Sequence, residues 1–176
     1  MVDDLGDDPY FEKPRDSRDF DAGLVRESLD VLPVREAVIL ASADTVTEAM
    51  RSMQREHRGC VLVTDDGTKE SKLLGIFTER DVLLRIVDRG KNPATLGIAE
   101  VMTPDPECLA VDSTVAHALN KMSVGGFRNI PVVDQEHRPA FVVSVRDVVG
   151  FLVEAFPREI LTLPGEDTSP KTREGA

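Results

Sequence analysis

The chain has 176 residues, of which 41% are hydrophobic and 30% are charged, and its formal net charge is −11 at pH 7. This composition fits a soluble globular protein with a sizeable core, and the acidic balance argues against general nucleic-acid binding. No apolar run is long enough to cross a bilayer, and the acidic N-terminus lacks the features of a signal peptide. Cys60 and Cys108 stand apart without a CxxC motif, so we expect reduced thiols in a cytoplasmic protein.

The N-terminal stretch, residues 1–28, is predicted to be an acidic arm. It combines many aspartates with Pro9 and Pro14 and begins without hydrophobic periodicity. Apolar residues first recur beyond Asp21, where they predict a short helix that lies against the core. The residues that form this pattern are Leu24, Val25, Leu29 and Leu32.

A strand–helix–strand–strand–helix order follows the arm. A short apolar strand is predicted at 38–40, and Thr45 marks the start of a helix with apolar side chains at i, i+3, i+4 and i+7. Two further strands are predicted at 60–63 and 73–77, and the last helix begins at Thr78. The apolar faces of the two helices consist of Val46, Ala49, Met50 and Met53, and of Val82, Leu83, Ile86 and Val87.

The same order of elements returns in the second half of the chain. Thr45-Val46-x-x-Ala49-x-x-x-Met53 recurs 69 residues later as Thr114-Val115-x-x-Ala118-x-x-x-Met122. Thr78-x-x-Asp81 recurs 66 residues later as Ser144-x-x-Asp147, because the first copy has the longer hairpin loop. The chain is therefore a tandem repeat. Its predicted parts are a first repeat at 29–90, a second repeat with its linker at 91–156, and a flexible tail at 157–176.

Thr78 and Asp81 allow two interpretations. As a capping box, the Thr78 hydroxyl accepts from the Asp81 amide and the Asp81 carboxylate accepts from the Thr78 amide, which accounts for both residues. Alternatively, a carboxylate at a strand–helix junction accepts from both hydroxyls of a ribose, and the amides of the helix end suit a phosphate. The motif alone leaves both interpretations open.

Three motifs together resemble a pair of cystathionine-β-synthase (CBS) domains. They are Gly75-x-x-Thr78-x-x-Asp81, Ile130-Pro131-Val132-Val133-Asp134 and Val101-Met102-Thr103-Pro104. The resemblance implies an α/β (α+β) fold in which two β-α-β-β-α repeats pack about a pseudo-two-fold axis, with two clefts at their interface. It also implies a regulatory role. Members of the family bind AMP, ADP, ATP, S-adenosylmethionine or NAD in these clefts and stack into dimers.

The resemblance also implies a set of ligand-binding residues. The two aspartates of the repeated motif are expected to hold the ribose, the hydroxyl residues before them to face ribose or phosphate, and the nearby arginines to contact phosphate. The expected residues are Gly75, Thr78, Arg80 and Asp81 in the first repeat, Ser144, Arg146 and Asp147 in the second, and Arg58, Arg128, Asn129 and Ile130 before or within the second strands.

The second repeat departs from the motif at one position, because Phe141 stands where the first repeat has Gly75. A phenylalanine either fills the cleft or turns away and packs. Since Gly75, Thr78 and Asp81 occur together, we expect one dominant adenosyl site with its ribose on Asp81.

The remaining motifs point to no catalytic or metal chemistry. His57-x-x-Cys60 has no second closely spaced pair, so we expect no metal site, and the sequence supplies no nucleophile with its base, so we expect no enzyme. No cofactor is expected other than an adenine nucleotide as regulatory ligand. The expected partners are that nucleotide, a second copy of the chain that covers apolar helical faces such as Val46 to Met53, and an unidentified regulated protein. The leading hypothesis is a regulatory module that senses an adenine nucleotide, as in energy sensing, and signals to a partner protein; a ligand-free structural dimerisation module is the alternative.

Overall fold

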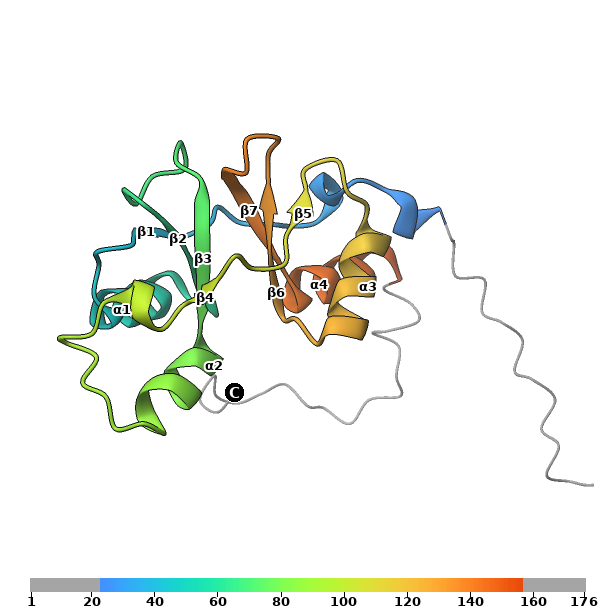
Figure 1. The fold of residues 1–176 in the computed structure, drawn as a ribbon. Helices are drawn as coiled ribbons and strands as arrows, with labels where there is room; N and C mark the ends of the chain where they lie inside the picture. Colours follow the sequence, from blue (N-terminus) through green and yellow to red (C-terminus); the bar gives the residue numbers. More distant parts are fainter. Residues whose placement is uncertain (1–22, 157–176) are drawn as a thin grey trace, which may run out of the picture.

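The sequence repeat folds into two sheets that lie side by side, each covered by its own helices (Figure 1). The computed structural model describes residues 23–156. Most of the predicted acidic arm and the predicted tail at 157–176, including Ile160 and Leu161, lie outside the described residues. The mixed architecture with two β-α-β-β-α units confirms the predicted fold class.

The first sheet has the strand order β1-β2-β3-β4. Strand β1 runs parallel to β2, and β2 pairs antiparallel with β3. The added strand β4 pairs with β3 and was not predicted from the sequence. The elements of this half are β1 (Ile39–Ala41), α1 (Val46–Glu56), β2 (Cys60–Thr64), β3 (Leu73–Thr78), α2 (Glu79–Asp81), the π-helix η3 (Val82–Val87) and β4 (Thr103–Pro104).

The second sheet repeats this pattern with three strands in the order β5-β6-β7. Strand β5 is parallel to β6, and β6 is antiparallel to β7. Its helices begin where the sequence predicted, directly after Thr114 and Ser144. The elements are β5 (Leu109–Ala110), α3 (Val115–Gly125), β6 (Asn129–Val133), β7 (Pro139–Ser144) and α4 (Val145–Ala155).

The segment that precedes each repeat packs on the other repeat. The N-terminal segment carries the short 3-10 helices η1 (Leu24–Arg26) and η2 (Leu29–Val31) and lies over the second sheet and its helices (Figure 1). The Leu29 amide donates to the Ser113 carbonyl at 3.1 Å, and Leu29 and Leu32 are buried in the second core. In the first half, the equivalent places are taken by η4 (Ile98–Glu100), whose Ile98 amide donates to the Asp44 carbonyl at 2.9 Å. The predicted single short helix at 24–32 is thus two separate 3-10 turns.

Alternation along the strands divides the buried side chains between two kinds of core. One face of β2 and β3 sends Val61, Val63 and Phe77 toward the helices of the first half. The opposite face sends Cys60, Leu62 and Ile76 toward the second sheet, where they pack with Val133 and Val142. This third cluster joins the two sheets, so the interface between the repeats is itself a hydrophobic core.

The apolar face predicted for the last helix of the first half is wrong in part. Of its four apolar residues only Ile86 is buried, whereas Leu83 and Val87 are 62% and 65% exposed. The physical reason is the π-helix, which advances each side chain by a smaller angle than an α-helix does and so rotates the α-helical stripe out of register. The corresponding helix α4 stays α-helical throughout and buries Val148 and Phe151.

The first helix α1 buries the face on which the predicted dimer contact depended. Val46 and Ala49 are fully buried and Met53 is 5% exposed, all within the first core. These three side chains therefore offer no surface to a second chain, whereas Met50, the fourth residue of the predicted face, is only partly buried and lines a cavity between the repeats. Among the described residues, the exposed large apolar side chains on helices lie elsewhere, at Val31, Leu83, Leu84, Val87, Val124, Val145 and Val149.

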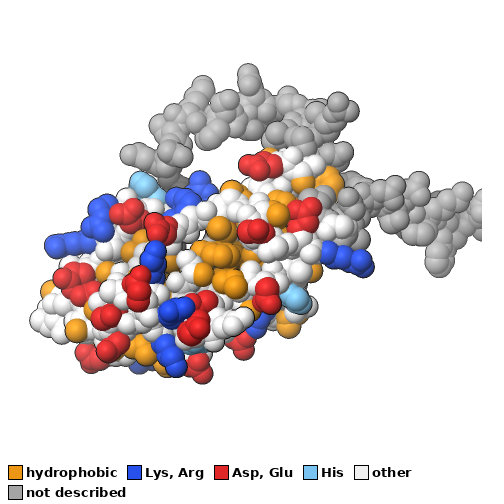
Figure 2. All heavy atoms as spheres, turned by 90° about the horizontal axis from the view of Figure 1, so that it is seen from above, with side chains coloured by type: hydrophobic (Ala, Val, Ile, Leu, Met, Phe, Trp, Pro, Cys, Tyr) orange, Lys and Arg blue, Asp and Glu red, His pale blue; other side chains and the backbone are white. Residues whose placement is uncertain are grey.

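Seen from above, hydrophobic side chains gather near the middle of the molecule and charged side chains of both signs surround them (Figure 2). Within residues 23–156, no helix has the length and apolar character that crossing a membrane requires.

Candidate functional site

Two cavities lie between the repeats, one at each strand–helix junction. The larger, about 710 Å³, is the Asp147 cleft, lined among others by Arg35, Arg58, Glu79, Arg128, Arg146 and Asp147. The smaller, about 550 Å³, is the Asp81 cleft, lined among others by Thr78, Arg80, Asp81, Arg85, Phe127 and Arg128. Both volumes fall in the range of small-ligand sites. Each cleft receives residues from both repeats, so a ligand in either one contacts both.

Ser144 and Asp147 form a complete capping box at the start of α4. Ser144 has extended backbone angles (φ −108°, ψ 159°), and its hydroxyl accepts from the Asp147 amide at 3.3 Å. Oδ2 of Asp147 accepts from the Ser144 amide at 2.8 Å and from its hydroxyl at 2.7 Å. The side chain of Asp147 is therefore fixed by its local sequence. Among the described residues, no hydrogen bond or ion pair engages its second oxygen, Oδ1.

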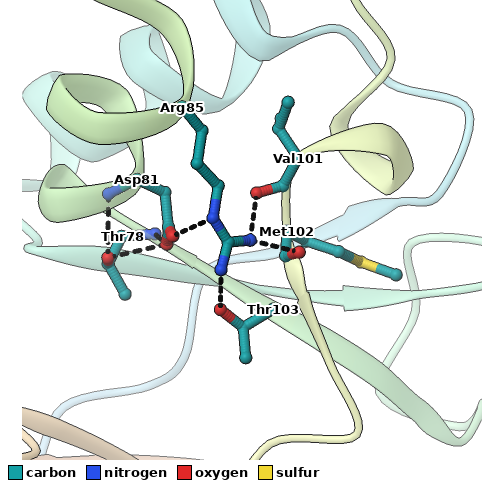
Figure 3. A network of polar contacts seen from close by, with 6 residues as sticks. All are labelled: Thr78, Asp81, Arg85, Val101, Met102 and Thr103. Carbon is teal, nitrogen blue, oxygen red and sulfur yellow. Dashed lines mark hydrogen bonds and ion pairs between the residues drawn. The ribbon is translucent and has the colours of Figure 1, made fainter. Parts of the chain in front are cut away.

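Thr78 and Asp81 form the same capping box at the start of α2. Oδ2 of Asp81 accepts from the Thr78 amide at 2.9 Å and from the Thr78 hydroxyl at 2.8 Å. Here the second oxygen has a partner, because Nε of Arg85 lies 3.2 Å from Oδ1. The same guanidinium donates onward to Val101, Met102 and Thr103 (Figure 3).

The two clefts also differ in charge. Four arginines line the Asp147 cleft against three acidic residues, whereas three arginines and three acidic residues line the Asp81 cleft. Burial lowers the pKa of the Arg58 guanidinium, the charge of Arg35 lowers this pKa further, and Asp147 opposes both effects. Arg58 and Arg35 thus repel each other in a partly desolvated place, where an anion would relieve the repulsion.

The structure brings most of the predicted ligand-binding residues to one cleft or the other. Ser144, Arg146, Asp147 and Arg58 line the Asp147 cleft, and Thr78, Arg80 and Asp81 line the other. Arg128 and Asn129 line both clefts. Ile130 has a fully buried side chain in the second core, and Gly75 lines neither cleft.

Gly75 and its counterpart Phe141 both lie on the helix-facing side of their sheets. A Cβ on Gly75 would stand 2.4 Å from Sδ of Met102 and 2.9 Å from the Thr103 carbonyl oxygen, so this glycine admits the segment around β4. Phe141 packs partly buried against the second core. The phenylalanine therefore does not fill the Asp147 cleft, and the reason for preferring the Asp81 cleft is removed.

Sequence reasoning missed five charged cleft residues, of which Arg35, Glu79 and Arg85 matter most for the site; the others are Glu36 and Glu107. Arg35 lies in a stretch without a motif, so no pattern indicated it. Glu79 follows Thr78 directly at a helix start, where acidic residues are common for reasons of stability alone. Arg85 follows Asp81 by four residues, a spacing at which opposite charges pair on a helix, and this signal was available.

The two cysteines and the histidines form no metal centre. Within residues 23–156, no group of three or more His, Cys, Asp or Glu side chains is placed to hold a metal ion. Cys60 lies at the wall of the Asp147 cleft, and burial raises the pKa of its thiol to about 12. A thiol with this pKa is protonated at neutral pH and is a poor nucleophile and a poor ligand.

Comparison with known families and proteins agrees with this architecture. The family model for the CBS domain matches twice, at residues 26–88 and 98–154. The CBS domain-containing protein CBSCBSPB1 of Arabidopsis thaliana is 35% identical over 128 residues, which are 72% of this chain and 22% of that protein. The chain spans only 13–22% of the length of the first curated relatives that it matches.

Two solved structures share the fold. The CBS domain pair of the protein MJ0100, in complex with 5-methylthioadenosine and S-adenosyl-L-methionine, is 25% identical with a TM-score of 0.61, covering 73% of this chain and 98% of that one. The CBS domain protein PAE2072 from Pyrobaculum aerophilum, complexed with AMP, is 22% identical with a TM-score of 0.62, covering 71% of this chain and 94% of that one.

Proposed function

The chain belongs to the CBS domain family, and we propose that it is a regulatory module that binds an adenosine phosphate in the Asp147 cleft and signals to a partner protein. One observation carries the proposal. Asp147 is held rigidly by its capping box, yet its Oδ1 has no partner among the described residues, at the wall of a cavity of about 710 Å³.

A ribose fits this unused oxygen. A carboxylate has about four lone-pair sites, and the capping box engages only Oδ2. The two hydroxyls of a ribose diol are donors at the right spacing for a carboxylate that is already fixed, so little ordering is required on binding. The fixed position of Asp147 also follows from short-range sequence, because Ser144 and Asp147 need only each other.

The charge of the cleft favours a phosphate over the sulfonium of S-adenosylmethionine. Arg35, Arg58, Arg128 and Arg146 converge on it, and charge-assisted hydrogen bonds from arginine to phosphate are among the stronger polar contacts. A bound anion weakens the mutual repulsion of Arg35 and Arg58, whereas a bound cation adds to it. That solved CBS structures contain AMP or S-adenosylmethionine supports an adenosyl ligand in general.

Signalling follows from the position of the cleft between the repeats. A ligand that prefers one relative orientation of the repeats shifts the population toward it. We propose that nucleotide binding slows hydrogen exchange at the two strand–helix junctions, 75–82 and 141–148, and in the linker at 88–98. Protection of one junction only would count against coupling between the repeats.

The exposed face of η3 suits a second copy of the chain. Leu83, Leu84 and Val87 are each more than half exposed and lie within one short segment. We propose a homodimer through this face, and a ligand-free dimerisation module remains the second candidate function on this observation. Light scattering distinguishes a dimer from a monomer of 19.3 kDa.

Because Cys60 and Cys108 are free, we also propose a cytoplasmic location.

A thermal-shift comparison tests the proposed function. AMP, ADP, ATP and S-adenosylmethionine are added in turn to the wild-type protein and to an Asp147→Ala variant. Since a ligand of the native state raises the melting temperature, we expect a rise with at least one adenosine phosphate, a smaller effect of S-adenosylmethionine, and a reduced rise in the variant. Unchanged melting temperatures with all four compounds would favour the dimerisation module and refute a nucleotide sensor.

A further inference from the structure

We infer that Arg85 determines which of the two clefts accepts a nucleoside. Its guanidinium occupies the carboxylate oxygen of Asp81 that a ribose would need, and this leaves the Asp147 cleft as the single open site. The inference rests on the proposed function, since it concerns where the proposed ligand binds. It assigns to one residue the difference between two sites whose motifs are otherwise alike.

The contacts of Arg85 occupy both the carboxylate and the neighbouring linker. Nε lies 3.2 Å from Oδ1 of Asp81. Nη1 donates to the carbonyl oxygens of Val101 at 2.7 Å and Met102 at 2.6 Å, and Nη2 donates to the Thr103 hydroxyl at 3.1 Å. Figure 3 shows the guanidinium lying between the Asp81 carboxylate and the chain before β4. The carboxylate oxygen Oδ1, which has no partner on Asp147 among the described residues, is therefore already paired with Arg85 on Asp81.

The π-helix leaves Arg85 on the cleft side, where its four-residue spacing from Asp81 lets the two charges pair. In the second repeat the buried core residue Phe151 follows Asp147 by four residues on the α-helix α4. In the first repeat the buried residue Ile86 follows Asp81 by five, which is the spacing of a π-turn. The extra residue places Ile86 in the core and releases Arg85, the residue that aligns with Phe151, to the cleft side.

Access to Asp81 therefore has a cost that access to Asp147 lacks. A ribose on Oδ1 of Asp81 must displace the Arg85 ion pair, and displacement also leaves the carbonyls of Val101 and Met102 without this donor. In the second repeat Phe151 is 8% exposed within the core and has no donor to offer Asp147. The two sites thus differ before any ligand arrives.

Titration calorimetry with AMP, ADP and ATP in turn tests the inference. The informative variant is Arg85→Met, because methionine keeps an unbranched stem and removes every hydrogen-bond donor of the guanidinium. The matched control is Arg51→Met, on the exposed surface of α1 and outside both clefts. For at least one nucleotide we expect one molecule per chain with the wild type and with the control, and two per chain with Arg85→Met.

A second pair of variants keeps the test independent of how well Arg85→Met folds. Asp147→Ala alone is expected to lose binding by at least tenfold, because the remaining site is held by Arg85. Combining it with Arg85→Met is expected to restore one site per chain. Circular dichroism verifies that each variant is folded.

The outcomes separate the inference from the function on which it rests. Two sites in the wild type, one site in a folded Arg85→Met, or full affinity in Asp147→Ala would each overturn the role of Arg85 and leave nucleotide binding intact. No heat from any nucleotide with any variant would overturn the proposed function, and the inference with it.

Discussion

The Asp81 and Asp147 clefts share a motif, a capping box and a place at the same interface, yet they present different surfaces to a ligand. Their capping distances agree closely, with 2.9 and 2.8 Å in one and 2.8 and 2.7 Å in the other. One turn further along the helix, an arginine follows in the first and a buried phenylalanine in the second. A site motif thus fixes the position of a carboxylate, and the next turn decides whether that carboxylate is available.

The comparison is sharpened most by exchanging each aspartate for alanine. Asp147→Ala should reduce nucleotide affinity about ten- to a hundredfold, or 1–3 kcal/mol, because ribose hydroxyls lose their acceptor. Asp81→Ala should leave affinity within about twofold of the wild type. Isothermal titration of the two variants measures both effects. The reverse ranking, with affinity lost only in Asp81→Ala, would show that the first repeat holds the ligand.

A second comparison concerns Gly75 and Phe141, the aligned positions that differ most in size. Gly75→Ala should cost about 1–3 kcal/mol of unfolding free energy, because the new Cβ meets the Thr103 carbonyl oxygen at 2.9 Å. Phe141→Leu should cost about 1 kcal/mol and leave nucleotide affinity unchanged, since Phe141 packs on the core and not on the cleft. Urea denaturation and titration of both variants provide the test. A changed affinity in Phe141→Leu would place this side chain at the ligand after all.

Removing the caps is expected to affect the two helices alike. Thr78→Ala and Ser144→Ala each delete a hydroxyl that accepts from the third amide of its helix, at 3.4 and 3.3 Å, so each should cost about 1 kcal/mol of stability. Ser144→Thr should retain most of the stability that Ser144→Ala loses, because threonine is the capping residue in the first repeat. Binding should weaken only in Ser144→Ala. Equal loss of affinity in both variants would argue that the clefts are equivalent.

The smallest expected effect concerns the thiols. Burial raises the pKa of Cys60 to about 12 and that of Cys108 to about 11, so both thiols are protonated at pH 8 and react slowly. Their reactivity should rise with pH, because only the thiolate attacks. Since Cys60 lines the Asp147 cleft and Cys108 does not, nucleotide should slow the modification of Cys60 alone. Protection of Cys108 with Cys60 unaffected would contradict a ligand in the Asp147 cleft.

Local sequence was sufficient for the architecture and for the capped carboxylates. The repeated helical faces and the Thr/Ser-x-x-Asp pairs act within one turn, so they predicted α1, α3 and the starts of α2 and α4 where the structure has them. Strand β4 was not predicted, nor was the packing of the segment before each repeat on the other repeat. They depend on contacts such as Leu29 with Ser113, which are far apart in the sequence.

The sequence predicted most of the residues that line the two clefts, but not which groups are free to meet a ligand. Gly75 was expected among the ligand-binding residues, but alternation along β3 puts it on the same face as the core residue Phe77, where the backbone at Thr103 approaches it. Arg85 was overlooked although its four-residue spacing from Asp81 was readable in the sequence, and the π-helix that keeps it out of the core was not predicted. Which face of a strand looks into a cleft, and which turn of a helix widens, depend on packing that no short motif records.

A crystal structure of the protein with ATP or AMP tests the central claim most directly, because it locates the ligand. The account predicts one nucleotide in the Asp147 cleft, with both ribose hydroxyls on Oδ1 of Asp147 and phosphate near Arg58 and Arg35. Arg85 should still lie on Asp81, with that cleft empty. A nucleotide on Asp81 with Arg85 displaced, while the Asp147 cleft stays empty, would contradict it.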